Sequence, residues 1–181
     1  MMNHLKSVLI VAVMALSTAL STGAASALEL GMTPSHVFGL WTNINNCLLA
    51  SAQVVADDTA WQRRLDSMSP AKFDGKKPAD VLARMAEFRD KLDRLRQAEG
   101  LEPTKTNDKT DGEITPSDVF LNSGHVLNAL VDWTIRNSGP DLLVSQFYSR
   151  QEFSGKTPSD VFGLLDLADR RLDALLAKHS G

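Results

Sequence analysis

The sequence predicts an all-α protein, a bundle of four main helices built from a duplicated helix pair. Two observations predict it: a short proline-containing phrase occurs four times, and each copy is followed by apolar residues spaced by four and then three positions. A recurring phrase indicates one repeated structural unit, and this spacing places apolar side chains on one helix face. The copies are MTPSHVF from Met32, KKPADVL from Lys76, ITPSDVF from Ile114 and KTPSDVF from Lys156.

Each copy of the phrase has the features of a helix start, with a T/K-P-S/A-D/H-V cap. Thr or Lys stands at the N-cap position, and the proline behind it takes the first helical position, where its missing N–H costs nothing. An Asp in the first turn is favoured by the helix dipole. In the first copy His36 holds the place of this Asp.

The stripes of apolar residues predict four helices of about twenty residues each, or about 30 Å at 1.5 Å per residue. The second copy continues through Val81, Met85, Phe88, Leu92 and Leu95, and the other copies keep the same register. A flanking Phe or Leu at 38, 82, 120 and 162 widens each stripe. We therefore expect globular packing of parallel or antiparallel helices rather than a narrow coiled-coil seam.

The first 27 residues predict a signal peptide. Lys6 precedes an apolar run over 8–16, and Ala25-Ser26-Ala27 has the small-x-small pattern of a cleavage site. The apolar run is shorter than the roughly 20 residues of a membrane span. We expect an exported protein, periplasmic or secreted, without stable membrane insertion.

The mature chain, residues 28–181, is expected to be a single all-α domain made of two repeats, about 32–98 and 114–176, joined by a polar surface linker at 99–113. Short extra helices are expected in the connections, near 57–68 and after Gly139-Pro140. We expect an approximate internal two-fold axis. The alternative is two separate helical hairpin domains, but each would have a thin core, so one merged core is favoured.

Composition excludes several functions. The formal net charge is −3, and removal of Lys6 with the leader makes it −4, which argues against nucleic acid and anionic membranes as partners. A single cysteine, Cys47, excludes an internal disulfide. We interpret Cys47 as a half-buried structural residue, with a reactive thiol or an intermolecular disulfide as alternatives. His36 and His125 could meet a metal together with Asp118, but they lack the spacing of a metal site, so no metal and no cofactor is predicted.

Candidate ligand-binding residues come from the first and third copies, which depart from the common pattern. Asn is a poor helix former, so Asn side chains within these helices are expected to bond across helices or to a ligand. The functional hypothesis is a ligand cavity between these two helices, closed by two tryptophans. The structural alternative is an irregular core with buried amide pairs. The candidate residues are Trp41, Asn45, Asn46, His125, Asn128 and Trp133.

The predicted function is an extracytoplasmic, soluble binding or sensor-like module for an unknown small ligand or protein partner. The alternative is a structural or interaction bundle that docks on a partner or on a second copy of itself as a homodimer. The charged runs 88–97 and 169–178 are interpreted as solvated outer faces that could serve such docking. No nucleophile with a base and no phosphate loop is readable, so an enzyme is not predicted.

Overall fold

The computed structural model describes residues 30–107, 112–138 and 142–179, and within them the protein is all-helical, as predicted. The predicted signal peptide lies outside the described residues. The long helices are α1 (Pro34–Val55), α3 (Pro78–Ala98), α4 (Pro116–Asn137) and α5 (Pro158–His179). Two short elements lie in the connections, α2 (Thr59–Asp66) and the 3-10 helix η1 (Val144–Tyr148). Each long helix begins at the proline of its phrase.

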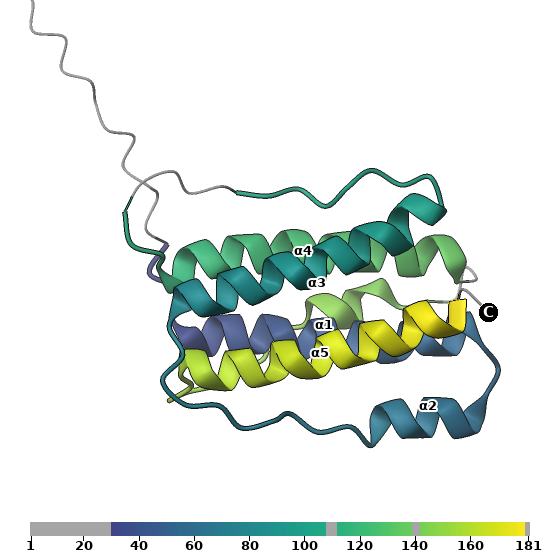
Figure 1. Cartoon of the computed structure of the whole chain (residues 1–181), viewed down its shortest axis with the longest axis horizontal. Coiled ribbons are helices and arrows are strands. Elements are labelled where there is room, and N and C mark those ends of the chain that lie inside the picture. Colours follow the sequence, from purple (N-terminus) through teal and green to yellow (C-terminus); the bar gives the residue numbers. More distant parts are fainter. Residues whose placement is uncertain (1–29, 108–111, 139–141, 180–181) are drawn as a thin grey trace, which may run out of the picture.

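The four long helices run in the same direction (Figure 1). Their first prolines and the valines that follow three residues later line one small depression at a single end of the molecule. Consecutive helices that run in the same direction cannot be joined by short turns, so each connection has to return along the whole helix length. This requirement explains why the connections 56–77, 99–115 and 138–157 are longer than a helical hairpin needs.

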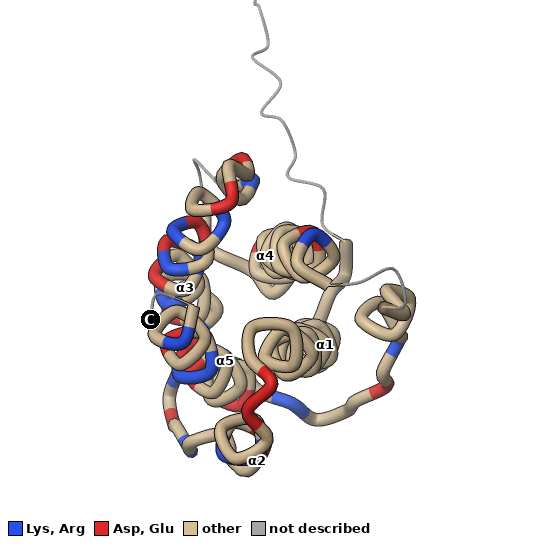
Figure 2. Tube along the Cα trace, turned by 90° about the vertical axis from the view of Figure 1, so that its right-hand side faces the viewer, with Lys and Arg blue, Asp and Glu red and all other residues tan. Residues whose placement is uncertain are grey.

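The long helices form a ring in the order α1, α4, α3, α5 (Figure 2). α1 and α3 both pack against α4 and α5, whereas α1 and α3 themselves lie diagonally opposite, as do α4 and α5. Every major contact between long helices therefore joins the first half of the chain to the second half. Within each half, the two long helices do not pack against each other as a hairpin would require.

Serine hydroxyls connect neighbouring helices at the end of the molecule where the long helices begin. Ahead of three of the long helices, a backbone N–H two residues before the helix proline donates to the serine that follows the proline of a neighbouring helix in the ring. The bonds are Met32 N to Ser117 Oγ at 3.3 Å, Lys76 N to Ser159 Oγ at 3.0 Å and Lys156 N to Ser35 Oγ at 3.1 Å. The fourth place in this ring holds Ala79, which has no hydroxyl.

These bonds connect α1 to α4, α3 to α5 and α5 to α1 in one rotational sense. A quarter-turn about the bundle axis therefore carries α1 to the place of α4 and α3 to the place of α5. The expected internal two-fold axis is wrong for this arrangement. In a ring of parallel helices a two-fold would exchange the diagonal partners α1 and α3, which belong to the same half of the chain.

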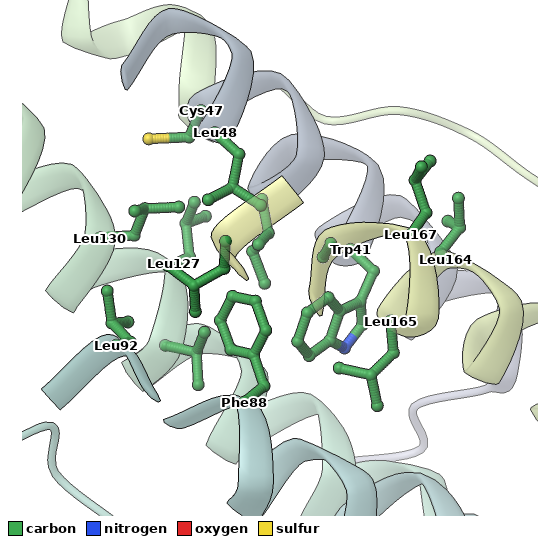
Figure 3. Packing of buried hydrophobic residues seen from close by; sticks show 14 of the residues in the cluster. Trp41, Cys47, Leu48, Phe88, Leu92, Leu127, Leu130, Leu164, Leu165 and Leu167 are labelled. Carbon is green, nitrogen blue, oxygen red and sulfur yellow. The ribbon is translucent and has the colours of Figure 1, made fainter. Parts of the chain in front are cut away.

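The core fills the middle of the ring with large apolar side chains (Figure 3). Trp41 of α1 and Phe88 of α3 meet edge to face, with ring centroids 5.3 Å apart, and both are fully buried. Leu92 and Leu172, from the predicted stripes, are also fully buried. These large side chains occupy the interior between the four long helices.

The charged run on α5 is partly interior, which corrects its interpretation as a solvated face. Asp169 is buried between α3 and α5, where Lys91 Nζ lies 2.8 Å from its Oδ1 and Arg84 Nη2 lies 2.5 Å from its Oδ2. Arg171 is buried on the other side of α5. Figure 2 shows that charges gather on α3 and α5, while α1 and α4 carry few.

Two matched glycines let the connections pass close to the helices. A Cβ at Gly163 of α5 would stand 2.6 Å from the carbonyl oxygen of Ala71, and a Cβ at Gly39 of α1 would stand 3.3 Å from that of Gln151. A Cβ at Gly124 of α4 would meet nothing within 4 Å.

We expect Gly163→Ala to destabilise the protein by about 1–3 kcal/mol, because backbone must shift to admit the methyl group. Gly39→Ala should have a smaller effect. Gly124→Ala serves as the control and should stabilise the protein by up to about 1 kcal/mol through helix propensity. Urea unfolding of the three variants measures these differences. Equal stability of Gly163→Ala and Gly124→Ala would show that the connection does not press on α5.

Candidate functional site

Three of the predicted ligand-binding residues belong to the packed interior. Trp41 is fully buried and its Nε1 donates to Ser123 Oγ at 3.0 Å. Trp133 is also fully buried, with its indole edge to face with His179 at 5.8 Å between centroids. The buried Asn45 donates to two backbone carbonyls and accepts from Arg171. These residues hold helices together and do not enclose a cavity.

The remaining three predicted residues lie at the surface in two separate places. Asn46 is exposed on α1. His125 and Asn128 lie on α4 and line a cavity of about 380 Å³ between α4, the end of α3 and the connection 102–105. We call it the linker cavity. The structure thus brings together His125 and Asn128 but separates them from the other four.

The polar connection beside the linker cavity is firmly anchored, although its composition suggested a plain surface linker. The buried Arg96 donates from Nε and Nη2 to the carbonyl oxygen of Glu102, at 3.0 and 2.9 Å, and its Nη1 lies 3.1 Å from Asp132. Asp93 Oδ1 accepts from both the backbone and the hydroxyl of Thr104. Because these polar groups already bind each other, the linker cavity offers few of them to a ligand.

A second cavity, of about 370 Å³, lies between α1, α4 and the segment that follows η1. We call it the α1/α4 groove. It combines an apolar floor with a rim of polar side chains, which is the usual composition of small-molecule sites. Its lining residues are Met32, His36, Gly39, Leu40, Asn43, Phe120, Leu127, Tyr148, Ser149, Arg150 and Gln151.

Asn43 holds one wall of the α1/α4 groove in place. Its Nδ2 donates to the carbonyl oxygen of Ser149 at 3.0 Å, and its Oδ1 accepts from Gln151 Nε2 at 3.0 Å. Tyr148 OH donates to Asn128 Oδ1 at 2.9 Å and so ties the same segment to α4. Gly39 allows this segment to approach α1 closely. The wall is therefore a positioned part of the groove.

His36 caps α1 in place of the aspartate found in the other copies. The backbone N–H of Thr33 donates to His36 Nδ1 at 3.0 Å, just as Thr157 N–H donates to Asp160 Oδ2 at 2.8 Å in α5. The backbone donation requires a lone pair on Nδ1, so the neutral ring carries its proton on Nε2. His36 thus completes the cap and keeps an N–H donor at the rim of the groove.

Sequence reasoning identified His36 as a departure from the repeat and expected Asn side chains of the same helix to bond across helices or to a ligand, but it did not place His36 and Asn43 in one site. It missed Tyr148, Arg150 and Gln151, because they lie in a connection whose path depends on the parallel direction of the helices. No local signal marks these three residues. The hypothesis of a cavity between α1 and α4 named the helices that border the groove, whereas the two tryptophans lie inside the core.

Cys47 is fully buried, more deeply than the half-buried position expected from the sequence. Burial raises the pKa of its thiol to about 12, against the opposing effect of hydrogen bonds from Thr134 and Ser51. The nucleophilic thiolate is therefore scarce at neutral pH.

We expect Cys47 in the folded protein to resist iodoacetamide at pH 8 and to react at once in denaturant. Mass spectrometry of alkylated protein measures the difference, which should exceed about 100-fold in rate because a free cysteine has a pKa near 8.5. A small peptide with one cysteine serves as the control. Rapid alkylation of the folded protein would contradict the buried placement.

Among the described residues, no group of three or more His, Cys, Asp and Glu side chains is placed to hold a metal ion. In the same part of the chain, no helix has both the length and the apolar character needed to cross a membrane. Comparison with known protein families, curated proteins and solved structures finds no match.

Proposed function

We propose that this protein is an extracytoplasmic helical binding or sensor-like module that holds a small ligand in the α1/α4 groove. The observation that carries the proposal is the groove itself, a cavity of about 370 Å³ with an apolar floor and a polar rim. Cavities of about 300–1,000 Å³ with this composition commonly bind small molecules. The proposed export rests on the leader at 1–27.

The helical scaffold suits this role. We propose that the four long helices are a bundle derived from a duplicated helix pair, since a quarter-turn relates α1 to α4 and α3 to α5 and the serine bonds follow the same rotation. The repeat then supplies the frame, and the departures from it, His36 and Asn43, line the groove. We propose binding rather than catalysis, because the lone Cys47 is buried and does not line the groove.

Native mass spectrometry of protein purified from its own host tests the binding role. We expect an added mass that Leu40→Trp abolishes, because Leu40 lines the groove and a larger side chain would fill it. Leu49→Trp, at another half-buried leucine of α1, is the matched control and should keep the added mass. If the added mass is equally present in Leu40→Trp, the groove is not the binding site.

A second candidate function is protein interaction, and a specific observation favours it. The large apolar side chains exposed in the described part of the chain, Leu121, Ile135, Leu143 and Tyr148, all belong to α4 and the connection after it. Leu143 is the most exposed, at 71 %. Light scattering of the wild type and of Leu143→Ser would reveal self-association that depends on Leu143; a monomer at all concentrations would exclude a homodimer.

A further inference from the structure

We propose, resting on the binding role of the α1/α4 groove, that its ligand is an organic carboxylate with an apolar body. The carboxylate would lie at the end of the groove near the start of α1, against His36 and Arg150. The apolar body would lie on Leu40, Phe120 and Leu127. Three features of the groove select this chemistry.

The first feature is the charge of the rim. Arg150 and His36 both line the groove, and among its described lining residues none is an Asp or a Glu. The Arg150 guanidinium is 83 % exposed and lies 4.0 Å from Glu152, which is equally exposed. A pair at this distance in water is worth little, so Arg150 can turn to a ligand and offer the paired N–H groups that match a carboxylate.

The second feature is that no acidic side chain balances the helix dipole at the start of α1. Asp80, Asp118 and Asp160 place a carboxylate in the first turn of the other long helices, where the helix dipole favours negative charge. In α1 no acidic residue occupies the first turn, because His36 stands there. A ligand carboxylate at this place would supply the negative charge that the other helices carry themselves.

The third feature is the direction of the hydrogen bonds that the rim can offer. Since His36 Nδ1 accepts from Thr33, the neutral ring has Nε2–H as its free donor. The oxygen and nitrogen of the Asn43 amide are already bonded to Gln151 and Ser149. The rim thus presents donors from His36 and Arg150, and an anionic carboxylate matches the positive charge of Arg150 better than an alcohol or an amine does.

Titration of the protein with octanoate, 1-octanol and octylamine, followed by two-dimensional NMR, tests this assignment. We expect octanoate to shift the resonances of groove residues and to bind at least about tenfold more tightly than octanol, which is about 1.4 kcal/mol. Octylamine should bind more weakly still. Arg150→Gln should weaken octanoate but not octanol.

His36→Asp is the decisive variant, because it restores the cap of the other three helices and so preserves the fold. It should lower octanoate affinity at least about tenfold and leave octanol unchanged, with a melting temperature no lower than that of the wild type. Equal affinity for octanoate and octanol in the groove would overturn the carboxylate assignment and leave the groove as a binding site. Absence of groove shifts with all three probes would overturn both.

Discussion

The two halves of the chain, residues 28–107 and 108–181, are expected to be largely unfolded when produced separately and to fold when mixed. The reason is the ring order of the helices. α1 packs on α4 and α5, and α3 packs on the same two helices, so neither half contains the partner surface for its own long helices. Most of the stability of a helix in a protein comes from tertiary packing of its apolar face, which each half lacks on its own.

Circular dichroism provides the measurement. Each fragment alone should keep less than about half of the helical signal at 222 nm, and an equimolar mixture should regain the signal and a cooperative melt. Leu172→Asp in the second fragment is the control, since Leu172 is fully buried and a charge there should prevent reassembly. A cooperative melt of either fragment by itself would show that the halves are independent hairpins.

The sequence predicted the helices well because each helix start is determined by residues that are close together in the sequence. Each long helix begins at the proline that the phrase placed in the first helical position, at Pro34, Pro78, Pro116 and Pro158. Capping, the proline restriction and the apolar spacing all act within a few residues. The short elements α2 and η1 lie in the connections where extra helices were expected.

The direction of the helices could not be predicted, because it depends on contacts between distant segments. The length of the connections was readable, but length alone does not distinguish a return crossover from a hairpin with an extra helix. The path of each connection decides which residues meet, so the groove wall formed by Tyr148 and Gln151 was also unpredictable. His36 could be singled out by its place in the phrase, whereas its groove could not.

Arg171 is a single residue whose burial could not be predicted from its local sequence. Its place in a charged run indicated solvent, yet α2 covers it. Its Nη1 donates to Asn45 Oδ1 at 3.0 Å and its Nε to the carbonyl oxygen of Leu65 at 3.2 Å, at the end of α2. Burial lowers the pKa of the guanidinium, partly offset by the charge of Asp66. Arg171 therefore joins α5 to both α1 and α2.

We expect Arg171→Glu to destabilise the protein by about 3–5 kcal/mol, because it leaves a buried anion facing a carbonyl oxygen and Asp66. For a chain of this size the melting temperature should fall by about 6–20 °C. Arg89→Glu is the control: Arg89 is half-buried on α3 and its nearest carboxylate, that of Asp90, is 3.9 Å away, so its melting temperature should change by only about 2 °C. The sequence alone placed both arginines on solvated faces and predicts equally small effects. Thermal melts of the two variants therefore distinguish the packed α2 cover from an open charged surface.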